Sequence, residues 1–241
     1  MRIAEFIHDK DHPQCTNVDF WIQKNIDYEL EKFIVSEIDD FSSVKGFDLI
    51  ILHGGSQHLW NKEADPWLYN EIKYVKYALK NKIPIIGFCL GSQIIAETLG
   101  GKVFKAEEKE VGWFKVTLRK EVKNNLLIKN LEDGLISFMW HSDHYNIPNN
   151  CTSLGFTEAA SNQIFTSNNS PAVGFQFHPE YTKENIKAYL ETYEDEHWSG
   201  GKYALGKEYF INQMNEIPET YNLFEQLMKN SLEWFLVKKQ D

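Results

Sequence analysis

Short apolar runs alternate with longer segments of helical period through the first hundred residues. β-strands are predicted at Arg2–Ile7, Lys32–Val35, Asp48–Leu52 and Ile83–Phe88, and the last two runs are apolar on both faces. Strands of that kind are typical of a parallel sheet that helices cover on each side. The pattern therefore predicts an α/β protein with a mostly parallel central sheet flanked by helices.

One helix is well marked between the third and fourth predicted strands. Apolar residues recur at helical spacing from Leu68 to Leu79. Asp65 can cap the N-terminus of this helix, and Pro66 suits its first turn. With its two flanking strands, the helix forms a βαβ unit whose crossover is expected to be right-handed.

A second helix is expected from Gly91 to Gly100, and after it the hydrophobic pattern of the sequence changes. Alternating runs between Val103 and Phe177 are separated by turn residues and predict further strands, some of them antiparallel. A third helix is expected from Lys183 to about Tyr193. The economical interpretation is a single domain over residues 1–241 that contains a small antiparallel element.

The C-terminal tail, from about residue 196 to 241, reads as a helical extension of this domain. Apolar residues recur at helical spacing between Phe224 and Leu236. A helix packed on the core explains this stripe most simply. A contact with a second copy in a homodimer, or with another partner, is the alternative.

Charge and cysteine content narrow the class of protein. The formal net charge of −10 argues against a nucleic-acid partner, because phosphate recognition relies on clustered Lys and Arg. Three cysteines, Cys15, Cys89 and Cys151, do not make a disulfide framework and favour a reducing, cytoplasmic compartment. No run approaches the ~18 apolar residues of a membrane span, and the apolar N-terminus is too short for a signal peptide. We expect a soluble protein with no membrane association.

Cys89 stands where a strand runs into a turn and the turn runs into a helix. Gly87 and Gly91 flank it two residues to each side, where side chains would collide with the neighbouring strand or helix. A nucleophile at such a corner has a strained backbone, and the positive end of the following helix favours its thiolate form. A buried cysteine acting only as a small hydrophobe is the alternative. The two flanking glycines, which we call the glycine frame, make this alternative the weaker one.

His178 and Glu180 are the candidates for the base and its orienting group. Residues two apart in an extended segment project to the same side, and Pro179 stiffens the backbone between them. A carboxylate beside an imidazole fixes the tautomer and stabilises the imidazolium. By itself this triplet could be an ordinary turn. Combined with Cys89, it predicts a Cys-His-Glu nucleophilic site.

The segment His53–Ser56 follows an apolar strand and carries two glycines. In a parallel α/β sheet this loop lies at the carboxyl edge, where the cysteine corner also emerges. Glycines allow a backbone N–H to point into the site and receive an oxyanion. A plain strand-ending turn is the alternative interpretation of this segment.

Two sets of residues resemble metal ligands in composition. His8, Asp9, His12 and Cys15 are close in sequence, but a loop after a first strand often gathers such polar residues. His141 and His144 form a second set for which the sequence offers no evident third ligand. We therefore expect neither a metal nor another cofactor.

The three motifs, in this order, resemble the class I (triad-type) glutamine amidotransferases. The similarity is to stand-alone members that are like the amidotransferase domain of GMP synthetase, and it runs from about residue 48 to residue 193. It rests on His53–Ser56, Gly87–Gln93, Glu110–Trp113 and Gly174–Glu180. The resemblance implies a flavodoxin-like class I amidotransferase fold.

The resemblance also implies a catalytic role for each motif. Cys89 would attack the side-chain amide of glutamine and form a γ-glutamyl thioester. His178, oriented by Glu180, would protonate the departing ammonia and later activate water. The backbone N–H groups of Gly55 and Leu90 would hold the oxyanion, a contribution worth roughly 100-fold or more in rate for each donor.

Substrate binding is implied in the same way. Gln93 would help to position the substrate, and Met139–Asp143, with Trp140 and His141, matches the stretch whose backbone binds the α-amino and carboxylate groups. The predicted substrate is glutamine, and the ammonia would go to a separate synthetase subunit or another acceptor enzyme. A hydrolase of γ-glutamyl peptides or conjugates needs the same triad and stays open. A non-catalytic interaction module is a third possibility, against which the intact triad argues.

Overall fold

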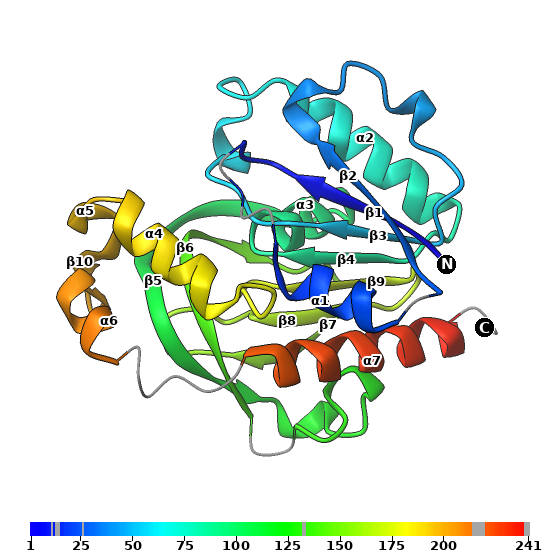
Figure 1. Cartoon of the computed structure of the whole chain (residues 1–241). Helices are drawn as coiled ribbons and strands as arrows, with labels where there is room; N and C mark the ends of the chain where they lie inside the picture. Colours follow the sequence, from blue (N-terminus) through cyan, green and yellow to red (C-terminus); the bar gives the residue numbers. More distant parts are fainter. Residues whose placement is uncertain (11, 13–14, 26, 132–133, 214–219, 239–241) are drawn as a thin grey trace.

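A curved, mixed β-sheet runs through the middle of the computed structural model, which describes residues 1–10, 12, 15–25, 27–131, 134–213 and 220–238 (Figure 1). The strand order is β10-β11-β5-β7-β8-β9-β4-β3-β1-β2, and β6 pairs with β5 off this path. The strands are β1 (Arg2–Ile7), β2 (Glu29–Ile34), β3 (Leu49–Leu52), β4 (Ile85–Phe88), β5 (Lys102–Leu118), β6 (Leu135–Asn146), β7 (Cys151–Phe156), β8 (Ile164–Ser167), β9 (Ala172–Phe175), β10 (Ser199–Gly201) and β11 (Tyr203–Leu205).

Helices cover both faces of the parallel part of the sheet, which consists of β2, β1, β3, β4 and β9. Figure 1 shows α2 and α3 on one face and α1 and α7 on the other. No helix in the described ranges is both long and apolar enough to cross a membrane. The helices are α1 (Asn17–Lys24), α2 (Trp67–Lys80), α3 (Leu90–Thr98), α4 (Lys183–Thr192), α5 (Asp195–Trp198), α6 (Lys207–Gln213) and α7 (Thr220–Lys238), with 3₁₀ turns η1 (Val35–Glu37), η2 (Phe41–Ser43), η3 (Leu59–Asn61), η4 (Lys120–Val122) and η5 (Leu126–Ile128).

Two apolar cores follow from the alternation of side chains along the central strands. Ile50 and Leu52 of β3 pack with the α2 and α3 residues, whereas Leu49 and Ile51 of the same strand pack with those of α1 and α7. Successive side chains of a strand point to opposite faces, so a strand between two helical layers must be apolar throughout. Phe224 of α7 is fully buried in the second core, which confirms that the terminal helix packs on the sheet.

The predicted fold class is confirmed, with differences at the element boundaries. β2 begins at Glu29, ahead of the predicted start at Lys32, because it pairs residue by residue with β1 as an edge strand and tolerates charged side chains. Asp65 does not cap α2. The N-cap residue of α2 is Pro66, and no side chain forms a capping hydrogen bond there. The predicted end of α3 is correct, since Gly100 adopts a φ of +100° just after it.

The antiparallel part is longer than the small element that the sequence suggests. β5 and β6 form a hairpin of 17 and 12 residues, and the far end of β5 joins the main sheet through β7. β11 adds in parallel to β5, and α4, α5 and α6 lie beside this hairpin (Figure 1). A third, largely aromatic core fills the space between them and includes Phe138, Tyr181, Trp198 and Phe210.

Candidate functional site

Cys89 occupies the corner between β4 and α3. Its φ of 47° and ψ of −110° lie in a region that non-glycine residues rarely adopt, as predicted for a nucleophile at such a turn. The backbone N–H of Cys89 donates to the carbonyl oxygen of Phe175 on β9 (2.8 Å). A Cβ on Gly91 would lie 2.2 Å from the Leu52 carbonyl oxygen, and one on Gly87 would lie 2.5 Å from the backbone of Gly91. The glycine frame is therefore a steric requirement of the corner.

His178 and Glu180 lie in the turn that follows β9, the strand next to β4. The ring Nδ1 of His178 and Oε1 of Glu180 are 2.8 Å apart, and both side chains are buried. The His178 backbone N–H donates to the carbonyl oxygen of Phe138 on β6 (2.8 Å). Asn17, at the start of α1, donates its backbone N–H to the Glu180 carbonyl oxygen and its side-chain amide to that of Pro179. The turn is thus fixed from both sides.

The protonation of His178 depends on its two charged neighbours. Burial would lower the pKa of the ring, but the carboxylate of Glu180 and the sulfur of Cys89 outweigh it and raise the pKa to about 10. His178 is therefore an imidazolium at neutral pH. An imidazolium beside a cysteine sulfur can act as a general acid.

A second polar pair lies behind Glu180. His53 Nε2 and Glu5 Oε1 are hydrogen-bonded, and His53 Nδ1 lies 4.0 Å from Glu180 Oε1. Burial lowers the pKa of His53 to about 3, so the ring is neutral. Glu5, His12 and His53 bring ligand atoms within 4.8 Å of one another. The ammonium of Lys32 lies 3.4 Å from Glu5 Oε2, which opposes the binding of a cation there.

The other residues of the loop after β1 do not assemble into a metal site. His8 Nε2 lies 2.9 Å from Glu71 Oε1, and both side chains are buried. Asp9 accepts hydrogen bonds from the backbone and hydroxyl of Ser56, and Cys15 is exposed. In the β5–β6 hairpin, by contrast, ligand atoms of Glu110, His141 and His144 lie within 4.8 Å of one another.

A cavity of about 330 Å³ opens in front of Cys89 and His178. Four of the predicted substrate or oxyanion residues line it, namely Gly55, Gln93, Trp140 and His141. Leu90 is the first residue of α3 and does not line the cavity with its side chain. The other lining residues come from the loops after β1 and β3, from the hairpin and from residues 181–197: Asp9, Ser56, Gln57, His58, Lys109, Val111, Ser142, Asp143, Tyr181, Tyr189, Tyr193, Glu196 and His197.

Gln176 is a site residue that the sequence reasoning did not single out. Its side-chain amide donates to the sulfur of Cys89 (3.7 Å), and its oxygen accepts from the amide of Gln93 (3.3 Å). The thiol in turn faces the carbonyl oxygen of Trp140 (3.8 Å). The available signal was its place in the sequence, since Gln176 directly follows β9 and precedes His178 by two positions.

Asp143 ends the stretch Met139–Asp143 that the resemblance indicated, and its side chain lies on the hairpin side of the cavity. Its Oδ2 is 2.7 Å from His58 Nδ1. The side chain is buried, and within the described chain its Oδ1 has no hydrogen-bond partner. A buried carboxylate oxygen that is not satisfied by the protein can accept from the ammonium group of an amino-acid substrate.

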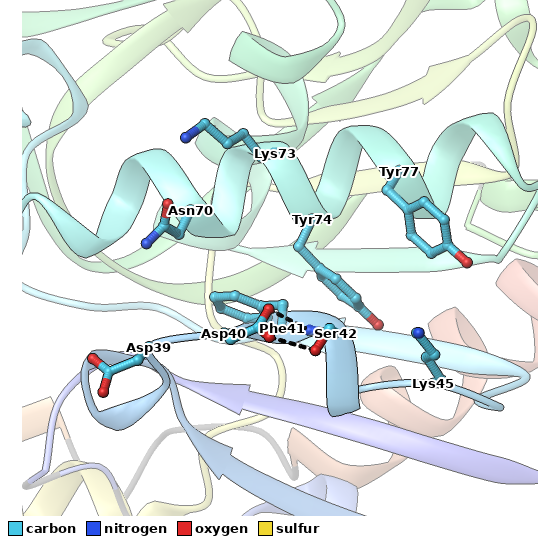
Figure 2. A pocket seen from close by; sticks show the side chains of 9 residues that line it. All are labelled: Asp39, Asp40, Phe41, Ser42, Lys45, Asn70, Lys73, Tyr74 and Tyr77. Carbon is cyan, nitrogen blue, oxygen red and sulfur yellow. Dashed lines mark hydrogen bonds between the residues drawn. The ribbon is translucent and has the colours of Figure 1, made fainter.

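A different cavity, between η2 and α2, has a similar volume of about 320 Å³ and shares no lining residue with the first (Figure 2). Figure 2 shows Asp39 and Lys45 at its opposite ends, with Tyr74 between them. The Asp40 carboxylate accepts from the backbone N–H of Ser42, and the Tyr74 hydroxyl donates to the Val44 carbonyl oxygen. These polar groups serve local structure, and the lining includes no cysteine or histidine.

Comparisons with known proteins agree on one family. Residues 19–193 match the family described as Glutamine amidotransferase class-I. The glutamine amidotransferase-like protein YfeJ of Salmonella typhimurium is 31% identical over 153 residues, which are 62% of this chain and 64% of YfeJ. A subunit of the glutamine-hydrolysing GMP synthase of Methanococcus aeolicus is 31% identical over 147 residues, 61% of this chain and 70% of that protein. A glutamine amidotransferase structure from Thermotoga maritima shares the fold, with a TM-score of 0.80, 24% identity and coverage of 98% and 97% of the two chains.

Proposed function

The chain belongs to the class I glutamine amidotransferase family, and from this premise we propose that it hydrolyses the side-chain amide of glutamine and releases ammonia for an acceptor. The observation that carries the proposal is that Cys89 and His178 line one cavity, with His178 hydrogen-bonded to the buried Glu180 behind it (2.8 Å). A strained, buried cysteine with a protonated imidazole beside it is suited to nucleophilic attack on a carbonyl carbon.

In the first step, the thiolate of Cys89 attacks the amide carbon of glutamine. The C–S bond forms, and the carbonyl oxygen becomes an oxyanion. We assign its stabilisation to the backbone N–H groups of Gly55 and Leu90. Gly55 lines the cavity, and Leu90 begins α3, whose N-terminus carries partial positive charge.

In the second step, the tetrahedral intermediate collapses. The C–N bond breaks, and His178 gives its proton to the nitrogen, which departs as ammonia while a γ-glutamyl thioester remains on Cys89. The now neutral ring takes a proton from water, whose oxygen attacks the thioester carbon. Breakage of the C–S bond yields glutamate and restores the thiolate–imidazolium pair, while Glu180 keeps the ring oriented throughout.

The acceptor of the ammonia is proposed to be a separate synthetase subunit or another enzyme. The relative from Methanococcus aeolicus is named as one subunit of a glutamine-hydrolysing GMP synthase, which supports a protein that supplies ammonia to a partner. The reaction requires a free thiol, and Cys15, Cys89 and Cys151 are all unbridged. A reducing, cytoplasmic setting fits this chemistry.

A hydrolase of γ-glutamyl peptides or conjugates is a second candidate, and one observation favours it. The lining of the cavity includes Glu196 and His197 of α5, which come after residue 193, the last residue of the family match. Such a cavity has room for a leaving amine larger than ammonia. The acylation chemistry at Cys89 would be the same, and only the amine that His178 protonates would differ.

Both candidates are tested in one assay. The purified protein is incubated with glutamine and, separately, with γ-glutamyl dipeptides, while ammonia and glutamate are measured. We expect equimolar ammonia and glutamate from glutamine, and no turnover by the Cys89→Ala variant. Turnover of dipeptides alone would replace the first candidate by the second. If neither substrate shows turnover that depends on Cys89, even with a co-purified ligase added, both are wrong.

A further inference from the structure

A cluster of Glu110, His141 and His144 lies in the β5–β6 hairpin, outside the Cys89–His178–Glu180 series. Glu110 of β5 and His141 of β6 are cross-strand partners, and His144 follows on β6. The pairing shifts register between Lys105 and Glu110, so the ladder is irregular opposite this part of β6. Although residues three apart on a regular strand point to opposite faces, the rings of His141 and His144 are only 5.2 Å apart between centroids.

Several polar atoms of this cluster are buried without a hydrogen-bond partner among the described residues. They include Glu110 Oε1, His144 Nε2 and both ring nitrogens of His141. His141 Nε2 lies 3.3 Å from Glu110 Oε2, yet the pair does not form an aligned hydrogen bond. Side chains of Glu110 and His141 are 0% and 1% exposed. Buried carboxylate and imidazole atoms that converge without protein partners are suited to hold an ion or a water molecule.

We propose that Glu110, His141 and His144 bind a divalent transition-metal ion, with Zn²⁺ as the best match. Two imidazoles and one carboxylate are the ligand set of open zinc sites, in which a fourth position takes water or another ligand. The ligand atoms already lie within 4.8 Å of one another, so the ion requires only small side-chain adjustments. Hard cations such as Mg²⁺ prefer all-oxygen sites and fit less well.

The surroundings of Glu110 distinguish this cluster from the Glu5–His12–His53 group beside the triad. There, the ammonium of Lys32 lies 3.4 Å from the Glu5 carboxylate and takes the place of a cation. Among the described residues, no Lys or Arg forms an ion pair with Glu110, which instead accepts a hydrogen bond from the Gln163 amide (2.6 Å). An outer partner of this kind orients a metal-binding carboxylate.

An ion can reach the cluster from two sides. His141 lines the cavity in front of Cys89, and His144 lines a second cavity of about 690 Å³. The residue before His141 is Trp140, whose carbonyl oxygen contacts the Cys89 sulfur. A bound ion would therefore sit in the wall of the catalytic cavity without contacting the triad. The site does not depend on the proposed glutamine hydrolysis.

The test uses the full chain carrying Cys89→Ala, so that the catalytic thiolate cannot compete for the metal. After treatment with a chelator, the protein is titrated with ZnCl₂ by calorimetry, and Co²⁺ is added separately to record its visible absorption. We expect one high-affinity Zn²⁺ per chain and the spectrum of a four-coordinate Co²⁺ site. Adding His144→Ala should weaken Zn²⁺ binding by roughly 100-fold or more and abolish the Co²⁺ spectrum.

The matched control is His58→Ala, which removes another histidine of the same cavity wall that pairs with Asp143. It should leave Zn²⁺ affinity within a few-fold of the parent. Glu110→Gln keeps the size of the side chain and should also lose the ion, and circular dichroism checks that each variant is folded. Absence of Zn²⁺ binding in the parent, or equal binding in the parent and the His144→Ala variant, would overturn the site. So would an equal loss in the His58→Ala variant.

Discussion

Two parts of the molecule enclose Cys89: the parallel half, which is the sheet of β2, β1, β3, β4 and β9, and the hairpin half, which is β5, β6 and the helices α4 to α6 beside them. They hold their residues in place by different contacts. In the parallel half, backbone meets backbone: the Cys89 N–H bonds to β9, and a Cβ on Gly91 would lie 2.2 Å from a carbonyl oxygen. In the hairpin half, side chains meet side chains, and the Trp140 ring stacks on that of Trp198 at 4.8 Å between centroids. A glycine packed against a backbone carbonyl tolerates no larger side chain, whereas one aromatic contact can be exchanged for another. We infer that the parallel half determines the chemistry and the hairpin half determines what enters the cavity.

Loss of the nucleophile is the largest effect expected from the parallel half. Cys89→Ala should reduce glutamine turnover by on the order of 10⁴-fold or more, because the thioester cannot form. Ammonia release measures it. The control is Cys151→Ala, a half-buried cysteine on β7, which should keep activity within about two-fold. Comparable turnover by both variants would refute the division between the two halves.

The next largest effect is expected from Glu180→Gln, which should lower kcat by roughly 10³- to 10⁴-fold. It should also change the pH dependence, since the carboxylate contributes to the raised pKa of His178, which is about 10. In the wild type the proton-donating form persists up to that pH. In the variant the basic limb of the kcat/KM profile should move toward the ordinary value of 6.5.

The same shift has a consequence for stability, with a definite sign. A ring whose pKa is raised on folding stabilises the native state fully below its unfolded pKa, and this contribution is lost as pH rises toward about 10. The difference in unfolding free energy between wild type and Glu180→Gln should therefore shrink between pH 6.5 and 10. Denaturant titrations at several pH values measure it. A difference that grows with pH contradicts the assigned ion pair.

Substitution in the glycine frame is expected to have an intermediate effect, and the quantity that it changes is the free energy of unfolding. Gly91→Ala should destabilise the protein by about 3 kcal/mol, because the Leu52 backbone cannot move away without disturbing β3. Gly100→Ala is the comparison, since open space surrounds it and only its positive φ opposes a side chain, at about 1 kcal/mol. Denaturant midpoints compare the two variants. Equal costs would mean that the corner is less crowded than the distances imply.

The smallest effect is expected from the hairpin half. Trp140→Phe should keep the cavity apolar but weaken the stacking on Trp198, a contact worth about 0.5–1.5 kcal/mol. We expect KM for glutamine to rise a few-fold to about ten-fold while kcat changes little. Steady-state kinetics with glutamine and with γ-glutamyl dipeptides separates the two constants. A fall in kcat as large as that of Glu180→Gln would assign chemistry to the hairpin.

The sequence was most informative where local chemistry determines structure. The Gly-x-Cys-x-Gly corner and the apolar strands could be read directly. The structure places Cys89 and His178 at one cavity and His178 within 2.8 Å of Glu180, whereas the catalytic roles of these residues stay predictions. The start of β2 was missed because its charged residues carry no apolar pattern, although backbone pairing to β1 holds them. The assignment of Asp65 as a cap was wrong, because the helix begins after Pro66 and no side-chain cap bond forms.

The remainder of the site depends on contacts between distant segments, which the sequence alone does not specify. Glu110 comes opposite His141 only through the register of a hairpin with an irregular ladder. Asp143 lies in a stretch that the resemblance indicated, but its contact with His58, 85 positions earlier, could not be read from the sequence. The roles of Gly55, Leu90 and Gln93 and the single-domain organisation over residues 1–241 stay predictions.

The central claim is that Cys89 carries the glutamyl group during turnover. The direct measurement is mass spectrometry of peptides from protein that is quenched in acid while it hydrolyses glutamine. We expect a Cys89 peptide that is heavier by one γ-glutamyl group and loses it on treatment with hydroxylamine, a nucleophile that cleaves thioesters. The claim would be contradicted by ammonia released from glutamine at an unchanged rate in Cys89→Ala, with no adduct on Cys89 in the wild type.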